Sequence, residues 1–93
     1  MRVEQFLHCN QFVIYDKNYV YFQSYQSLIA RYDLTNCELE LYEDWDYSIT
    51  TLKHLYKFIE MQDYQLWNRI NNYKSKKLGI IKQIMNGTII KCY

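Results

Sequence analysis

Apolar and polar residues alternate along the first part of the chain with the period of two that is typical of half-buried β-strands. The residues expected to face a core are Val13, Tyr15, Val20, Phe22, Leu28, Ala30 and Tyr32. Ile29 and Arg31 fall on the opposite face of the last of these strands. Residues 16–18 and 33–36 are rich in Asp and Asn, which favour tight connections, so two hairpin turns are predicted.

A further strand is predicted at residues 38–43, where leucines and glutamates alternate. Leu39 and Leu41 lie on one side of this segment and the glutamates lie on the other. This pattern is typical of a strand with one face on a core and one face in water. The first half of the chain is therefore predicted to form an antiparallel β-meander.

After Ser48 the apolar spacing changes to three and four residues, which indicates an amphipathic helix. Either Asp46 or Ser48 can accept the free N–H groups of its first turn. The buried face of this helix is predicted to hold Ile49, Leu52, Leu55, Tyr56 and Ile59.

A second long helix is predicted from Ser75 to a left-handed cap at Asn86 and Gly87. Residues 63–74 predict a short helix followed by a loop, and residues 88–91 are expected to return to the edge of the sheet. The core face of the second long helix is predicted to hold Leu78, Ile81, Ile84 and Met85.

These elements place the chain in the α+β class, as an antiparallel β-meander with two or three helices packed on one face. The length of 93 residues is enough for a single domain, 1–93. The apolar content of 49% predicts a folded soluble domain, and no apolar run is long enough for a membrane span or an export signal. Phe, Tyr, Met, Ile, Asn and Lys outnumber Gly, Ala, Arg and Pro, a bias typical of an AT-rich bacterium, phage or mobile element.

Three segments resemble a family of small uncharacterised proteins encoded by phages and mobile elements of Gram-positive bacteria. They are residues 45–59, which begin Trp-Asp-Tyr-Ser, residues 22–30 and residues 84–90. The resemblance covers roughly residues 19–91 and leaves out the first eighteen residues and residues 66–73. It implies a phage-type context and a domain of unknown function, and it implies no catalytic residue.

The residue types that carry catalysis do not form a recognisable set in this sequence. His8 and Cys9 are neighbours on a predicted strand, so their side chains point to opposite faces and cannot easily act as base and nucleophile. His54 is expected to be a structural hydrogen-bonding group. We therefore expect no enzymatic activity, no cofactor and no metal site. The cysteines Cys9, Cys37 and Cys92 are expected to be reduced and partly buried in a cytoplasm, which is the host cytoplasm if the protein is encoded by a phage.

Charge divides the chain into an acidic half and a basic half. Residues 1–46 carry three basic and eight acidic side chains, whereas residues 47–93 carry eight basic and two acidic ones. The acidic half ends in a run of carboxylates, which either forms a solvated strand face and a helix cap or imitates the phosphates of a duplex. This run consists of Glu38, Glu40, Glu43, Asp44 and Asp46.

The eleven tyrosines exceed what a domain of this size can bury, so some are expected on the surface, where tyrosine favours protein interfaces. A strand surface that uses tyrosine for its β-propensity alone is an equal alternative. The predicted protein-binding residues are Tyr19, Tyr21, Tyr25, Glu38, Glu40, Glu43 and Asp44. The alternative nucleic-acid-binding residues are Trp67, Arg69, Tyr73, Lys74, Lys76 and Lys77.

Three functional hypotheses follow from these features. The first is a non-enzymatic phage or mobile-element accessory protein that binds a host protein, its sharpest version being inhibition of a host defence nuclease in the manner of anti-CRISPR proteins. The second is a nucleic-acid-binding accessory domain that uses the basic half of the chain. The third is a structural homo-oligomer that pairs through its tyrosine face.

Overall fold

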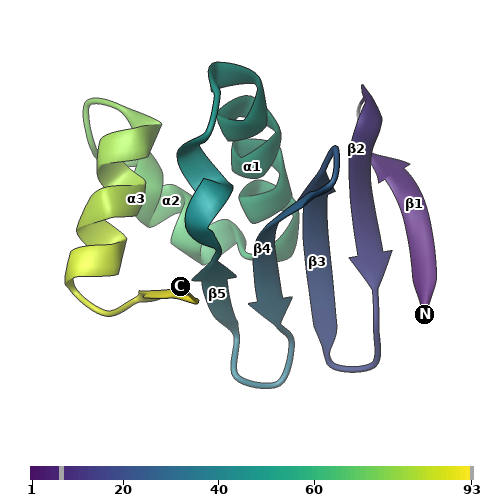
Figure 1. Cartoon of the computed structure of the whole chain (residues 1–93). Coiled ribbons are helices and arrows are strands. Elements are labelled where there is room, and N and C mark those ends of the chain that lie inside the picture. The colour runs from purple at the N-terminus through teal and green to yellow at the C-terminus, as the bar shows by residue number, and fades with distance from the viewer. Residues whose placement is uncertain (7, 93) are drawn as a thin grey trace.

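The computed structural model describes residues 1–6 and 8–92, with the backbone alone for residues 8 and 9. The described residues form one six-stranded sheet and three α-helices, in the α+β class that the sequence predicts (Figure 1). The strands are β1 (Arg2–Phe6), β2 (His8–Tyr15), β3 (Tyr19–Ser24), β4 (Ser27–Asp33), β5 (Glu38–Leu41) and β6 (Ile89–Lys91). The helices are the 3-10 turn η1 (Glu43–Asp46), α1 (Ile49–Gln62), α2 (Tyr64–Asn71) and α3 (Lys76–Met85).

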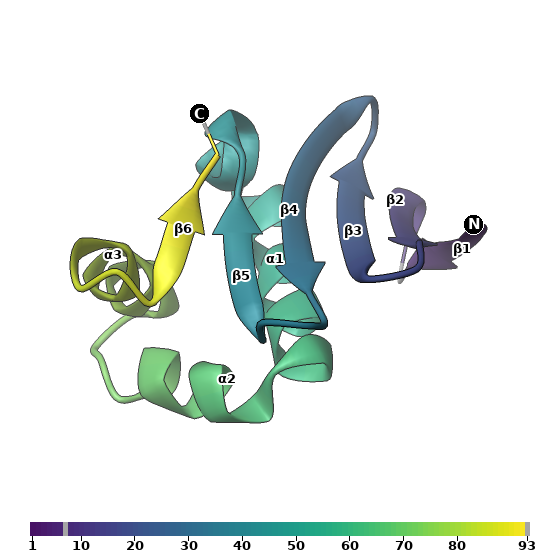
Figure 2. The same cartoon turned by 90° about the horizontal axis from the view of Figure 1, so that it is seen from below.

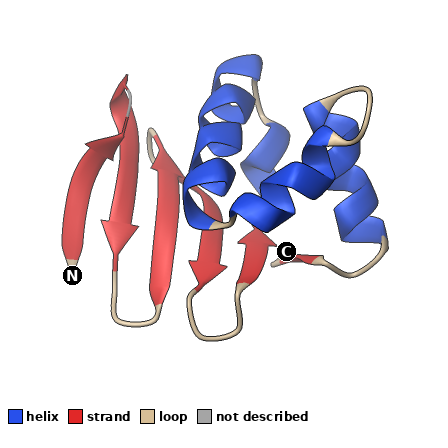
Figure 3. Ribbon diagram, turned by 180° about the vertical axis from the view of Figure 1, so that it is seen from behind, coloured by secondary structure: helices blue, strands red, loops and turns tan. Residues whose placement is uncertain are grey.

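The strands follow one another across the sheet in chain order, from β1 at one edge to β6 at the other (Figure 2). The first five strands pair antiparallel, which confirms the predicted meander. β6 returns after the helices and pairs parallel to β5, as expected for residues 88–91. The α-helices lie on one face of the sheet, with α1 over β3 and β4, and β1 extends beyond them (Figure 3).

The core lies between the helices and the sheet. Phe22 of β3 and Phe58 of α1 are fully buried, and their rings stack with centroids 5.7 Å apart. Leu39 and Leu41 of β5 are also buried, which confirms the alternation that predicted this strand. In the part of the chain that the structure describes, no helix combines the length and apolar character needed to cross a membrane.

Strand β4 departs from the predicted alternation. The register with β3 shifts between Phe22 and Gln23, so that Ala30 pairs with Phe22 but Leu28 pairs with Gln23. The extra residue at this bulge is Ile29, which is 1% exposed, whereas Leu28 is only half-buried. The prediction that Leu28 faces the core and Ile29 faces away is therefore wrong, because a bulge shifts the alternation by one residue.

Helix α1 begins at Ser48, whose hydroxyl accepts the N–H of Thr51, so Ser48 rather than Asp46 provides the cap. The predicted core position Ile49 is 75% exposed. Leu55 and Ile59 are buried as predicted, and Leu52 and Tyr56 pack half-buried against the core. Thr51 and Phe58, which were not predicted to face the core, are buried as well. The predicted helix is thus confirmed, but its buried face is rotated away from its first apolar residue.

Helix α3 is confirmed between its Ser75 cap and Gly87, which has a φ of +85°. Thr88 N–H donates to the carbonyl of Gln83 and Gly87 N–H donates to that of Ile84, the pairing of a Schellman cap. Its predicted core face is wrong at three positions, because Leu78, Ile81 and Met85 are all exposed. The buried residues of this helix are Gly79, Ile80 and Gln83.

Gly79 explains this rotation of α3. A Cβ added to Gly79 would lie 2.3 Å from the carbonyl oxygen of Ile70, so the missing side chain lets α3 approach the backbone of α2. Gly-to-Ala in an ordinary helix interior stabilises by about 1 kcal/mol. At position 79 we expect the opposite, a loss of about 1–3 kcal/mol in the free energy of unfolding, because α2 and α3 must separate. Urea denaturation of Gly79→Ala measures this loss, and a gain in stability would contradict the packing.

Candidate functional site

Within residues 1–6 and 8–92, no helix covers the second face of the sheet, which we call the open face. Cross-strand neighbours share a face, so the strand pairings define one row of side chains that crosses the whole sheet. This cross-sheet row consists of Val3, Ile14, Tyr21, Arg31, Glu40 and Ile90. Val3 at one edge is 57% exposed and Ile90 at the other is 37% exposed, whereas the residues between them are half-buried by one another. The open face is therefore apolar at both ends and polar in its centre.

Arg31 organises the centre of the open face. Its Nε and terminal nitrogen donate to the two carboxylate oxygens of Glu40 at 3.0 and 2.5 Å. Its guanidinium also lies over the ring of Tyr19, 4.4 Å from the centroid, and the rings of Tyr19 and Tyr21 are 6.1 Å apart. These contacts hold two tyrosines and an arginine in fixed positions.

Cys92, which follows β6, completes this cluster. Its thiol donates to Glu40 at 3.1 Å, and burial together with this hydrogen bond raises the pKa of the thiol. The thiol thus stays protonated and acts as a donor rather than as a nucleophile. Cys92 is half-buried as expected, Cys37 is exposed against expectation because it lies in the β4–β5 turn, and the side chain of Cys9 lies outside those described.

Two carboxylates of the sheet have a pKa below the ordinary value. The hydrogen bonds from Arg31 lower the pKa of Glu40, and those from Asn36 lower the pKa of Asp33. A lowered pKa in the folded state means that the unfolded chain binds protons more tightly, so this stability is present above a pH of about 4 and is lost as the pH falls further.

We therefore expect the free energy of unfolding to decline as the pH falls below about 4. Urea unfolding at a series of pH values measures this decline. The double variant Asp33→Asn, Glu40→Gln should be less stable at neutral pH and should have a flatter profile. An equally steep profile in the double variant would show that other carboxylates cause the decline.

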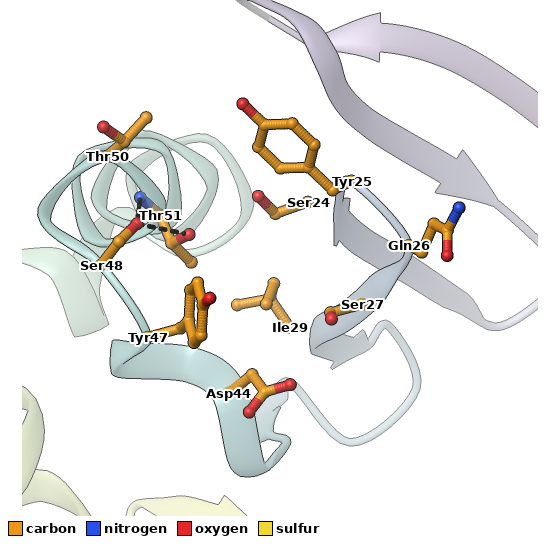
Figure 4. Close-up of a pocket in the computed structure, with 10 residues that line it drawn as sticks. All are labelled: Ser24, Tyr25, Gln26, Ser27, Ile29, Asp44, Tyr47, Ser48, Thr50 and Thr51. Atoms are coloured by element: carbon orange, nitrogen blue, oxygen red, sulfur yellow. Dashed lines mark hydrogen bonds between the residues drawn. The ribbon is translucent and has the colours of Figure 1, made fainter.

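A pocket of about 590 Å³ lies where the β3–β4 turn, η1 and the first turn of α1 meet (Figure 4). Tyr25, at the turn, has a φ of +55°, and Figure 4 shows its ring and that of Tyr47 on opposite sides of Ser24 and Ile29. Ser24 and Ile29 form a buried floor. The lining residues are Ser24, Tyr25, Gln26, Ser27, Ile29, Asp44, Tyr47, Ser48, Thr50 and Thr51.

The structure divides the predicted protein-binding residues between these two places. Tyr19, Tyr21, Glu38 and Glu40 lie on the open face, whereas Tyr25 and Asp44 line the pocket. Tyr25 does not share the strand face of Tyr19 and Tyr21, because it lies in the turn beyond β3. Glu43 is exposed in η1.

The alternative nucleic-acid-binding residues are also divided. Trp67 is 8% exposed and its ring packs beside Tyr56, so its face lies in the core rather than in solvent. The ammonium of Lys76 lies 5.9 Å from the Trp67 ring centroid, and that of Lys77 lies 3.7 Å from a carboxylate oxygen of Asp46. The remaining predicted nucleic-acid-binding residues are exposed, namely Arg69, Tyr73 and Lys74.

Metal-ligating side chains do not gather at either place. Among the residues whose side chains the structure describes, no three His, Cys, Asp or Glu lie close enough to hold a metal ion together. The side chains of His8 and Cys9 are outside those that the structure describes, so the prediction that they point to opposite faces stays a prediction.

Comparison with models of protein families matches residues 1–77 to a family of unknown function, DUF8033. The chain belongs to the DUF8033 family. No curated protein and no solved structure matches the chain. The DUF8033 match includes the first eighteen residues and residues 66–73, which lie outside the resemblance described from the sequence. The match ends before residues 84–90, which are part of that resemblance.

The DUF8033 match contains every residue that lines the pocket. It also contains the cluster of Tyr19, Tyr21, Arg31 and Glu40, whereas Cys92 and Ile90 lie beyond it. Sequence reasoning missed Arg31, although its place opposite Ala30 and Tyr32 on an alternating strand was a usable signal. It also missed the pocket, because no pattern along the chain places residues 24–29 beside residues 44–51.

Proposed function

We propose that this protein is a non-enzymatic accessory protein, encoded by a phage or mobile element, that binds a host protein through the open face of its sheet. The observation that carries the proposal is the cross-sheet row, in which aromatic and aliphatic side chains surround a fixed Tyr–Arg cluster. Tyrosine and arginine are the residue types that most often dominate the binding energy of interfaces.

The contacts of Arg31 support this proposal energetically. Ordering a free arginine or tyrosine at an interface costs about 0.5–1.5 kcal/mol for each side chain. Here Glu40 and the Tyr19 ring already hold Arg31, so much of this cost is met before the partner arrives. An open face with preordered side chains is suited to a stable contact with a protein surface.

Charge favours a partner with a basic surface. Glu38 lies on the open face, and Glu43 and Asp44 are exposed in η1 beyond the end of β5. Carboxylates at the rim of an interface raise the association rate with a basic protein surface but contribute little to the binding affinity. Glu40 has a different role, because its oxygens are bound by Arg31 and Cys92 and it positions the cluster.

The sharpest form of the proposal is inhibition of a host defence nuclease by occlusion, in the manner of anti-CRISPR proteins. Nucleases present basic surfaces to their substrates, and a tyrosine-rich face bordered by the exposed carboxylates Glu43 and Asp44 complements such a surface. This form requires that the captured partner be a nucleic-acid-processing protein.

Affinity capture from a host lysate, with and without nuclease treatment, tests the proposal. We expect the parent to capture a protein partner whether or not the lysate is treated with nuclease. Tyr64→Ala is the matched control and should capture the same partner, since Tyr64 is an exposed tyrosine on α2, on the helical side of the sheet. Tyr21→Ala should weaken binding by about 2 kcal/mol, roughly 30-fold. Equal capture by Tyr21→Ala would exclude the open face as the binding surface. Loss of capture after nuclease treatment would favour the nucleic-acid-binding hypothesis. Capture of this chain alone would favour the homo-oligomer hypothesis.

A further inference from the structure

The pocket beside the β3–β4 turn has walls that suit a cation. Asp44 is the one charged side chain among its ten lining residues, and none of the ten is basic. The exposed rings of Tyr25 and Tyr47 flank the opening, and their faces attract positive charge (Figure 4). The walls of the pocket therefore contain a carboxylate and two aromatic rings.

The inner end of the pocket carries a buried hydroxyl. Ser24 is 4% exposed and lines the pocket, and its hydroxyl can accept a hydrogen bond from a ligand. A donor-rich group that enters beside Ser24 would therefore meet a hydrogen-bond acceptor at the floor of the pocket.

The N-terminus of α1 also borders the pocket and by itself favours anions. It carries only about half an elementary charge, and Ser48 already accepts the N–H of Thr51 at its first turn. Asp44 and its exposed neighbour Glu43 carry two full negative charges in η1. The balance of charge at the opening is therefore negative, which favours a cation over a phosphate or carboxylate.

We propose that this pocket binds a basic side chain, lysine or arginine, of the partner protein. The charged group lies between the rings of Tyr25 and Tyr47, pairs with Asp44 and donates a hydrogen bond to Ser24. This inference rests on the proposed function because the basic side chain belongs to the protein that the open face binds. It adds a specificity pocket at the end of the sheet to the contact made by the open face.

The test uses small probes and does not require the partner. Nα-acetyl-lysine methylamide and Nα-acetyl-arginine methylamide are titrated into the protein and followed by NMR, with the neutral Nε-acetylated lysine compound as the matched probe. We expect at least one charged probe to shift the signals of Tyr25, Tyr47 and Ser24 with millimolar affinity, on the order expected for one cation–π and ion-pair contact. The neutral probe should shift them at least about fivefold more weakly.

Two variants and a control sharpen the result. Asp44→Asn should weaken the charged probe about fivefold, and Tyr25→Gly should weaken it while keeping the turn, because glycine adopts a φ of +55° without strain. Glu4→Gln removes an exposed carboxylate on β1 and should change nothing. Equal shifts with the neutral probe, no shift with either charged probe, or a response to inorganic phosphate instead would overturn the inference.

The outcomes separate this inference from the proposed function. If the charged probes bind but capture fails, the pocket is a cation-binding site and the proposed binding of a host protein is contradicted. If capture depends on Tyr21 but no probe binds, the cation site is contradicted and binding through the open face is supported.

Discussion

Replacing Phe58 by alanine is expected to lower the free energy of unfolding by about 3–5 kcal/mol, because the change opens a cavity where α1 meets the sheet. Phe58 is 0% exposed and its ring stacks on that of Phe22. Urea or thermal denaturation of the purified variant measures the loss, and for a domain of this size the melting temperature should fall by well over ten degrees.

Ile49→Ala is the matched control for Phe58→Ala. The apolar spacing of the helix predicts a core position at Ile49, but the structure leaves this side chain 75% exposed. Its truncation should change stability by less than about 0.5 kcal/mol. Comparable losses in the two variants would mean that α1 is rotated about its axis relative to the structure.

Asp63→Ala should be the next most damaging substitution, with an expected loss of about 2–4 kcal/mol in the free energy of unfolding. One carboxylate oxygen accepts the N–H of Leu66 and caps α2, and the other accepts the hydroxyl of Tyr32 at 2.8 Å. Losing the cap costs about 1 kcal/mol, and leaving the hydroxyl of Tyr32 without its partner costs about 1–3 kcal/mol more.

A double-mutant cycle separates these two contributions. Tyr32→Phe alone removes the hydroxyl and should cost about 1 kcal/mol. In the Asp63→Ala background the same change should cost nothing or restore stability, because it removes the orphaned hydroxyl. Losses that simply add would show that the Tyr32–Asp63 hydrogen bond contributes nothing to folding.

The elements of the fold were largely predictable because their signals are local. Strict alternation of Glu and Leu defines β5, and Ser48 and Ser75 cap helices where the apolar period changes. Strand β1 was not predicted, since four of its five residues are exposed and show no alternation. It is held by pairing with β2 at the edge of the sheet, which is a tertiary effect.

The faces of the elements were less predictable than the elements themselves. In α3 three of the predicted core residues, Leu78, Ile81 and Met85, point outward, because close contact at Gly79 decides which side of the helix packs on α2. In β4 the bulge at Ile29 turns this side chain into the core. Both effects depend on the neighbouring element, and a hydrophobic pattern along one segment does not contain that information.

The candidate site was predictable in part for the same reason. The alternation in β3 correctly places Tyr19 and Tyr21 on the face opposite Val20 and Phe22. The contacts of Arg31 with Tyr19 and Glu40 require the registers of β3, β4 and β5, which only the assembled sheet provides.

Site-specific photo-cross-linking tests most directly whether a protein partner contacts the open face. A benzoyl-phenylalanine replaces Tyr21 on the open face or Tyr64 on α2, and each protein is irradiated with the captured partner. We expect a cross-link from position 21 and none from position 64, since the helices occupy the other side of the sheet. A cross-link from position 64 with none from position 21, in a protein that still binds, would contradict the account.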